Sequence, residues 1–171
     1  FFQNENVFSL GVCNGCQMLS QLRSLIPGTD NWPIFKRNIS EKFEARLVQV
    51  IVKDSPSILY KGMKGSVIPI PVAHGEGRVE ASNESLKNLD KKFTTISYAD
   101  SFGEDTETYP LNPNGSPHGI AGVTNENGRV TIMMPHPERA FLNDQYSWCP
   151  EDWLNYSPWI KLFQNAKDFI D

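Results

Sequence analysis

Long apolar runs are missing from this 171-residue chain, and so is any excess of positive charge. No apolar stretch approaches the roughly 20 residues that a membrane-spanning helix needs. Sixteen Lys and Arg stand against 20 Asp and Glu, which gives a formal net charge of −4. No basic cluster supplies the stripe that a nucleic-acid groove requires, and no secretory signal pattern is present. The composition therefore argues against both a membrane protein and a nucleic-acid binder.

Cysteine is scarce as well, with only Cys13, Cys16 and Cys149 in the chain. A small, odd number of cysteines does not make a disulfide scaffold, so we expect a reducing compartment and a cytoplasmic location. Cys149 and three scattered histidines are the only further soft ligands, and they lack the paired spacing of zinc sites. We therefore predict no metal and no cofactor within this chain.

The chain does contain enough apolar material for a core, because 39% of its residues are hydrophobic. No repeat, low-complexity tract or charge block divides it, so we interpret residues 1–171 as a single domain. The chain starts without Met, and an apolar run at residues 7–10 leads almost at once into a tight motif. Because doubly wound sheets rarely begin with their functional strand, we expect a partial domain that is incomplete at its N-terminal side.

The hydrophobic pattern predicts a mixed α/β fold in which strands outnumber helices. Apolar segments, most of them rich in Val and Ile, predict strands at residues 7–12, 44–52, 66–73, 93–98, 119–124 and 129–134. The last two flank an Asn-Glu-Asn-Gly sequence, which is a strong hairpin signal.

Two helices are predicted from apolar residues that recur at helical spacing. The first runs from Gln17 to Ile26 and is expected to bury Met18, Leu22, Leu25 and Ile26. The second starts at Ser157 as N-cap and is expected to bury Trp159, Phe163, Ala166 and Ile170.

A candidate nucleophile lies between the first strand and the first helix. In Gly11-Val12-Cys13-Asn14-Gly15 a sharp turn holds the central residue in a strained conformation, with its side chain above the sheet. The N–H of Asn14 would then point at a developing oxyanion, and the helix N-terminus would favour the thiolate of Cys13. The same residues also form a C-x-x-C motif, so a redox pair of Cys13 and Cys16 remains an alternative.

A candidate base follows the last predicted strand, in Pro135-His136-Pro137-Glu138. Each proline disfavours a helical conformation in the residue before it, which pushes His136 into an extended conformation. With a period of two, His136 and Glu138 then share one side of the chain. The carboxylate can hold one imidazole nitrogen while the other faces a thiol.

Together these motifs resemble those of a known enzyme family. Gly11-Val12-Cys13-Asn14-Gly15-Cys16-Gln17 is similar to the G-x-C-x-G-x-Q elbow of class I glutamine amidotransferases, and Pro135-His136-Pro137-Glu138 is similar to their P-x-H-x-E. Further segments in the same order resemble the C-terminal glutaminase domains of large, single-chain phosphoribosylformylglycinamidine synthases. They include Ile26-Pro27-Gly28, Phe43-Glu44-Ala45-Arg46, His74-Gly75-Glu76-Gly77-Arg78 and Asn112-Pro113-Asn114-Gly115-Ser116-Pro117.

The resemblance implies a flavodoxin-like α/β fold, with a mixed central sheet and flanking helices, that hydrolyses L-glutamine through a thioester. Cys13 would be the nucleophile, His136 the base and acid, and Glu138 its orienting partner. The N–H of Asn14 would contribute to the oxyanion hole. Gln17, Gly75 and Glu76 would bind the substrate, whereas His74 and His118 are interpreted as structural.

The resemblance also implies a partner. Ammonia would pass to synthetase domains of the same parent chain, which use ATP and Mg²⁺ to amidate formylglycinamide ribonucleotide in purine biosynthesis. The family's domain extends further at its N-terminal side and carries there a second oxyanion donor, whose loss typically costs about 10²- to 10³-fold in rate.

Three alternatives stay open on the sequence alone. They are a thiol–disulfide oxidoreductase that uses Cys13 and Cys16, a catalytically inert fragment, and a docking module. The last would use the aromatic residues near the C-terminus, which are Trp148, Trp153, Tyr156 and Trp159.

Overall fold

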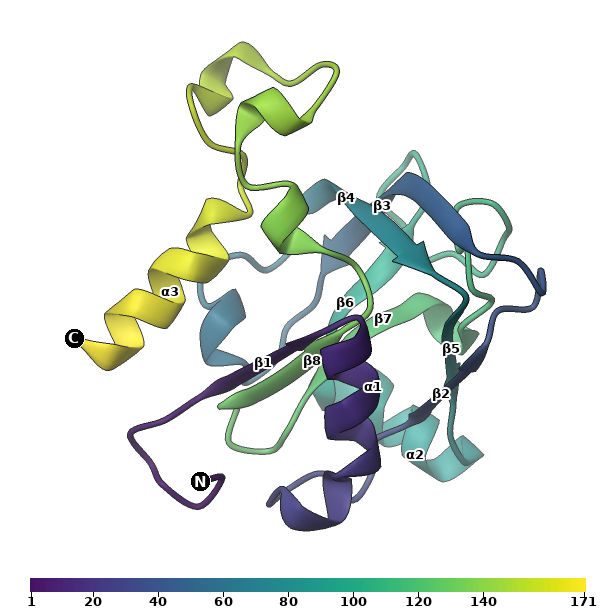
Figure 1. Cartoon of the computed structure of the whole chain (residues 1–171), viewed down its shortest axis with the longest axis vertical. Coiled ribbons are helices and arrows are strands. Elements are labelled where there is room, and N and C mark those ends of the chain that lie inside the picture. Colours follow the sequence, from purple (N-terminus) through teal and green to yellow (C-terminus); the bar gives the residue numbers. More distant parts are fainter.

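The computed structural model describes the backbone of residues 1–171 and every side chain except that of Asp90 (Figure 1). The described backbone forms eight strands and three α-helices. Their order is β1 (Ser9–Val12), α1 (Asn14–Gln21), β2 (Ile34–Arg37), β3 (Glu44–Val52), β4 (Val67–His74), β5 (Glu76–Glu80), α2 (Asn83–Asn88), β6 (Thr94–Ala99), β7 (Ile120–Thr124), β8 (Val130–Met133) and α3 (Ile160–Ile170). No helix in this described part of the chain has the length and apolarity needed to span a bilayer.

Six strands form one mixed sheet in the order β1-β8-β7-β6-β3-β4, while β2 and β5 pair separately. Only β1 and β8 run parallel, and each other neighbouring pair is antiparallel. All six strands predicted from the sequence are present, and the predicted hairpin joins β7 to β8 with Gly128 at φ 74°. The predicted mixed α/β class with a central mixed sheet is confirmed.

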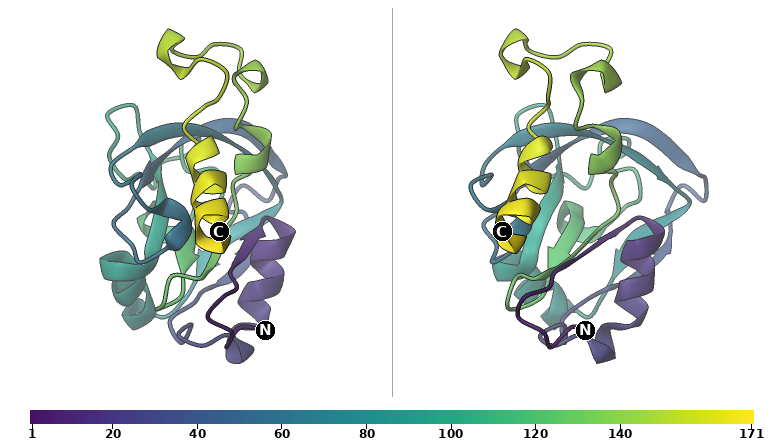
Figure 2. Two further views of the ribbon diagram at one scale, coloured as in Figure 1. Left: turned by 90° about the vertical axis from the view of Figure 1, so that its left-hand side faces the viewer. Right: turned by 60° about the vertical axis from the view of Figure 1, so that its left-hand side comes forward.

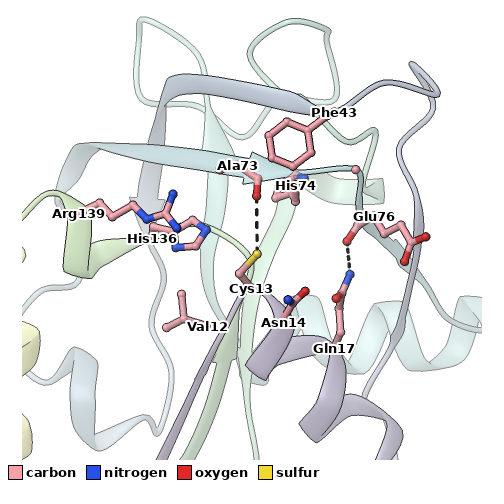
Figure 3. Close-up of a pocket in the computed structure, with 11 residues that line it drawn as sticks. Val12, Cys13, Asn14, Gln17, Phe43, Ala73, His74, Glu76, His136 and Arg139 are labelled. Atoms are coloured by element: carbon pink, nitrogen blue, oxygen red, sulfur yellow. Dashed lines mark hydrogen bonds between the residues drawn. The ribbon is translucent and has the colours of Figure 1, made fainter.

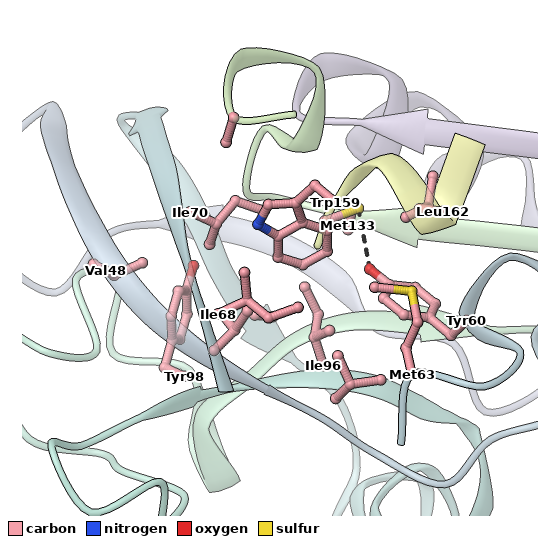
Figure 4. Close-up of a cluster of buried hydrophobic side chains, with 14 of the residues drawn as sticks. Val48, Tyr60, Met63, Ile68, Ile70, Ile96, Tyr98, Met133, Trp159 and Leu162 are labelled. Carbon is pink, nitrogen blue, oxygen red and sulfur yellow. Dashed lines mark hydrogen bonds between the residues drawn. The ribbon is translucent and has the colours of Figure 1, made fainter. Parts of the chain in front are cut away.

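The sheet is covered by a helix on each face. α3 contributes Leu162, and Trp159 just before it, to a core over one face, together with inward side chains of β3, β4 and β6 (Figure 4). α1 contributes Cys16 and Leu19 to a second core, with Ile132 of β8. Figure 2 shows the two helices on separate sides of the strands.

The sheet curls so that its two edge strands approach each other. β1 and β4 lie at opposite ends of the strand order, and β3 and β4 arch over the ends of β1 and β8 (Figures 1 and 2). The N–H of His136, three residues beyond β8, donates to the carbonyl oxygen of Pro71 in β4 across 2.9 Å. The curl therefore places the last residues of β4 above the carboxyl ends of β1 and β8.

The predicted buried face of the first helix is wrong except at Ile26, which is 3% exposed. Met18, Leu22 and Leu25 are 57%, 38% and 66% exposed, and the α-helix ends at Gln21. The turn before α1 sets the rotation of the helix: a Cβ on Gly11 would come within 2.7 Å of the carbonyl oxygen of Gly15. This close approach of strand and helix turns Cys16, Leu19 and Ser20 inward in place of the more apolar side chains.

The prediction for the C-terminal helix is correct in part. Trp159 is fully buried, but Ile170 is 68% exposed, and the α-helix begins at Ile160 rather than near Ser157. Leu162 and Asn165 complete the buried stripe, because the amide of Asn165 donates to two carbonyl oxygens of the turn that follows β3.

Candidate functional site

A pocket of about 570 Å³ opens at the carboxyl ends of β1 and β8, below β4 (Figure 3). Its lining comes from four places in the chain: the elbow and α1, the segment before β3, the β4–β5 turn, and the turn after β8. The lining residues are Val12, Cys13, Asn14, Gln17, Phe43, Ala73, His74, Gly75, Glu76, His136 and Arg139. Its size suits a small polar metabolite.

Strand pairing brings the predicted nucleophile and base to one edge. β1 and β8 run parallel with Val12 opposite Met133, and the N–H of Cys13 donates to the carbonyl oxygen of Met133 across 2.9 Å. Cys13 follows β1 directly, and His136 follows β8 by three residues. Both side chains therefore project into the same pocket (Figure 3).

Cys13 has the strained backbone that the elbow motif predicts. Its φ of 53° and ψ of −109° lie outside the regions that non-glycine residues normally adopt. Such a conformation costs about 1–3 kcal/mol and persists only where the surroundings impose it. The strain aims the sulfur away from the strand and towards β4, where its Sγ lies 3.7 Å from the carbonyl oxygen of Ala73.

The helix N-terminus favours the thiolate of Cys13, as expected, but burial has the larger effect on its pKa. Burial raises the pKa of the Cys13 thiol above its usual value, although the N–H of Asn14 and, less strongly, the charge of Arg139 act to lower it. A neutral thiol also suits the Ala73 carbonyl, which can only accept a hydrogen bond. The sulfur therefore needs a base to become a nucleophile.

His136 has the geometry of such a base. Its Nδ1 lies 2.6 Å from Oε1 of Glu138, and the residue is 5% exposed. A carboxylate can only accept a hydrogen from Nδ1, and in the imidazole tautomer that this contact selects, the lone pair falls on Nε2. Among the described residues, that Nε2 is buried and has no hydrogen-bond partner. Nε2 of His136 is therefore available to accept a proton from a group in the pocket.

The three predicted substrate-binding residues also lie in the pocket lining. The amide Nε2 of Gln17 donates to the carbonyl oxygen of Glu76 across 2.5 Å, which ties α1 to the β4–β5 turn (Figure 3). Gly75 is the one residue between β4 and β5. Every residue that the sequence analysis assigned to the site therefore lies in the pocket lining, apart from Glu138, which contacts His136 instead.

Sequence reasoning missed His74, which it interpreted as structural. His74 lines the pocket, is 3% exposed, and has no partner for either ring nitrogen among the described side chains. Burial, reinforced by the nearby His136, lowers the pKa of His74 to about 4, so the ring is neutral near pH 7. The alternation of Ile68, Ile70 and Val72 along β4 could have found it, because His74 continues the inward-facing series.

Arg139 was missed too, although it directly follows the His-Pro-Glu motif. It lines the pocket, and its Nε lies 3.4 Å from Oε1 of Glu138. His118 lies elsewhere, in the turn at Pro117–Gly119, outside the pocket lining.

The alternative functions find less support. Cys16 is fully buried, which raises the pKa of its thiol well above the usual value, so it is a poor partner for thiol exchange with Cys13. The residues that the structure describes contain no group of three or more His, Cys, Asp or Glu that could hold a metal ion. Of the aromatic residues near the C-terminus, Trp159 belongs to the core, whereas Trp148 is 80% exposed.

Comparison with known proteins agrees with the motifs. The family described as the CobB/CobQ-like glutamine amidotransferase domain matches residues 1–170. Among solved structures, the chain is similar to PurLQS from Thermotoga maritima at 30% identity, with a TM-score of 0.66 over 95% of this chain. It shares its fold with a candidate GMP synthase component from Thermoplasma acidophilum, at 12% identity and a TM-score of 0.54 over 98% of this chain. The match covers 61% and 59% of those two chains, less than two thirds of either.

The low pKa of His74 predicts a pH-dependent stability. Between pH 4 and 6.5 the unfolded chain binds a proton at His74 that the folded chain does not, so stability rises with pH across this window. The full effect is about 3 kcal/mol, of which about 2 kcal/mol is lost by pH 5. Urea unfolding of the wild type and of His74→Gln at pH 5 and 7 measures it. Equal pH dependence in both proteins would contradict the assignment.

Proposed function

Because the chain belongs to the CobB/CobQ-like glutamine amidotransferase family, we propose that it hydrolyses the side-chain amide of L-glutamine and releases ammonia. One observation carries this proposal: Cys13, with its strained backbone, and His136, whose ring contacts Glu138, both line the same pocket. A cysteine with a base, and a third group that orients the base, is the arrangement that acyl transfer needs.

The proposed reaction starts with proton transfer from Cys13 to Nε2 of His136, which the raised pKa of the thiol makes necessary. The sulfur attacks the amide carbon, and the N–H of Asn14 stabilises the resulting oxyanion. His136 then returns the proton to the leaving nitrogen, so ammonia departs and a glutamyl thioester remains. His136 next takes a proton from water, which attacks the thioester. The carbon–sulfur bond then breaks, glutamate leaves, and His136 returns the proton to the sulfur of Cys13. Glu138 stabilises the protonated ring in each step.

Substrate recognition is assigned to the side of the pocket where α1 meets the β4–β5 turn. Gln17, Gly75 and Glu76 bind the amino-acid end of glutamine, which leaves its amide next to Cys13. The contact between Gln17 and the carbonyl of Glu76 supports this role, because it fixes the distance between the β4–β5 turn and α1, which begins directly after Cys13. No cofactor takes part in this step.

The ammonia is proposed to serve an ATP- and Mg²⁺-dependent synthetase portion that amidates formylglycinamide ribonucleotide in the purine pathway. Support comes from the ordered motifs and from the 30% identity with PurLQS. The segment at residues 141–157 is the proposed contact. It projects from the body (Figures 1 and 2), carries Trp148 and Leu154 at 80% and 82% exposure, and follows the turn that holds Glu138.

Reaction with 6-diazo-5-oxo-norleucine, a reactive glutamine analogue, tests the glutaminase proposal. We expect one adduct on Cys13 by peptide mapping, blocked by glutamine, and no adduct in Cys13→Ala. Labelling should slow by about 10²-fold or more in His136→Ala, because the base is lost. Cys16→Ser is the matched control and should label like the wild type. A folded wild type that glutamine does not protect, or that labels at another cysteine, would overturn the proposal.

A complementation assay tests the proposed partner. Adding the chain to a synthetase portion that lacks a glutaminase, with ATP and Mg²⁺, should allow amidation with glutamine in place of ammonium. Replacing Trp148 and Trp153 together by Ala should raise the half-saturating concentration of the chain about tenfold or more, as loss of an aromatic anchor does. Cys13→Ala should abolish only the glutamine-dependent reaction. An unchanged half-saturating concentration would refute the contact.

A further inference from the structure

The wall of the pocket next to α1 is an unusually short turn. β4 ends at His74 and β5 begins at Glu76, so Gly75 alone connects them. These three residues all line the pocket. A turn that meets the substrate must be held still, and its hydrogen-bond partners show what holds it.

Asn38, which directly follows β2, binds this turn from behind. Its Nδ2 donates to the carbonyl oxygen of His74 across 2.8 Å, and its Oδ1 accepts from the N–H of Gly77 across 3.1 Å. Its own backbone N–H donates to the carbonyl oxygen of Gly75 across 2.9 Å. Asn38 thus makes three hydrogen bonds to residues 74–77, one to each end of this stretch and one to Gly75 within it.

The side chain of Asn38 is only 2% exposed, and its remaining amide hydrogen goes to the carbonyl oxygen of Lys42 at 3.0 Å. Both amide hydrogens and the oxygen therefore have partners. Replacing it would leave backbone groups of the turn buried and unpaired, which is far more costly than losing an exposed contact.

The residues around the turn leave no room for a side chain at Gly77. A Cβ on Gly77 would come within 2.7 Å of the His74 ring and 3.0 Å of the Asn114 amide, so the stretch accepts no side chain there. Asn114 donates to the carbonyl oxygen of Gly77 at 2.8 Å. On the pocket side, the carbonyl of Glu76 accepts from Gln17. The turn is therefore clamped between Asn38 at the end of β2 and α1, which starts directly after Cys13.

We propose that Asn38 is a positioning residue, which fixes the turn at residues 74–77 at the distance from Cys13 that a bound glutamine needs. Asn38 is absent from the pocket lining and acts through the turn alone. The inference rests on the proposed glutaminase function. It assigns Asn38 to substrate binding rather than to the chemistry of the thiol, because Cys13, His136 and Glu138 are held by other contacts.

Asn125 provides a matched control. It is 1% exposed, its Nδ2 donates to the carbonyl oxygen of Pro27 at 3.0 Å, and its Oδ1 accepts from the N–H of Val130 at 3.0 Å. These hydrogen bonds are of the same kind as those of Asn38, but they hold the β7–β8 hairpin, which does not line the pocket. Asn38→Ala and Asn125→Ala should therefore lower the Tm by similar amounts.

Two measurements separate the variants. Inactivation by 6-diazo-5-oxo-norleucine at varied concentration gives a half-saturating concentration and a limiting rate. Asn38→Ala should raise the former about 10- to 100-fold and leave the latter within about threefold, because misplaced binding groups weaken binding. Amide hydrogen exchange at Gly77, whose N–H donates to Asn38, should accelerate at least tenfold. Asn125→Ala should change neither.

Asn38→Ser removes the donors to His74 and Lys42 without placing a charged acceptor against their carbonyl oxygens, so an effect close to that of Asn38→Ala is expected, and this variant serves if Asn38→Ala does not fold. Equal half-saturating concentrations in the Asn38 and Asn125 variants, or unchanged hydrogen exchange at the turn, would overturn the proposal that Asn38 positions the turn. Failure of the glutaminase proposal looks different, since the unsubstituted chain would then show no glutamine-protected labelling. In that case the exchange rates alone decide whether Asn38 holds the turn.

Discussion

The hydrogen bond from the N–H of His136 to the carbonyl oxygen of Pro71 is the contact on which the site depends. It joins the end of β8 to β4, although three strands separate them in the sheet order. Parallel pairing of β1 and β8 brings Cys13 and His136 to one edge, but pairing alone would leave that edge open. The curl adds β4 and its turn as the opposite wall, and so converts a sheet edge into a pocket.

Burial has two consequences at this edge. It keeps His74 uncharged, with a pKa of about 4, and it raises the pKa of the Cys13 thiol. The pocket therefore favours a neutral thiol at Cys13 and a neutral ring at His74, which keeps the sulfur from reacting without a base. In the proposed mechanism activation falls to His136, whose Nε2 has no partner among the described residues while Glu138 holds Nδ1. In this account the proton moves from Cys13 to His136, and charge is separated, only when the substrate is bound.

The sequence predicted what depends on local pattern and missed what depends on packing. The strand at Glu44–Val52 was placed correctly because the segment is rich in Val and Ile. The strands Ile34–Arg37 and Glu76–Glu80 escaped notice because they are short and carry charged side chains. The buried face of α1 was misjudged because the tight elbow, not apolar content, sets the helix rotation.

Within the site, the elbow and the His-x-Glu pair were visible because neighbouring residues define them. Asn38 was not, because its role depends on how the β4–β5 turn and the strand end at Arg37 meet in space. The most direct test is to quench the chain during turnover of glutamine and to examine the Cys13 peptide by mass spectrometry. The account predicts a hydroxylamine-sensitive glutamyl adduct on Cys13. Glutamate release by a Cys13→Ala chain, or turnover with no adduct on Cys13, would contradict it.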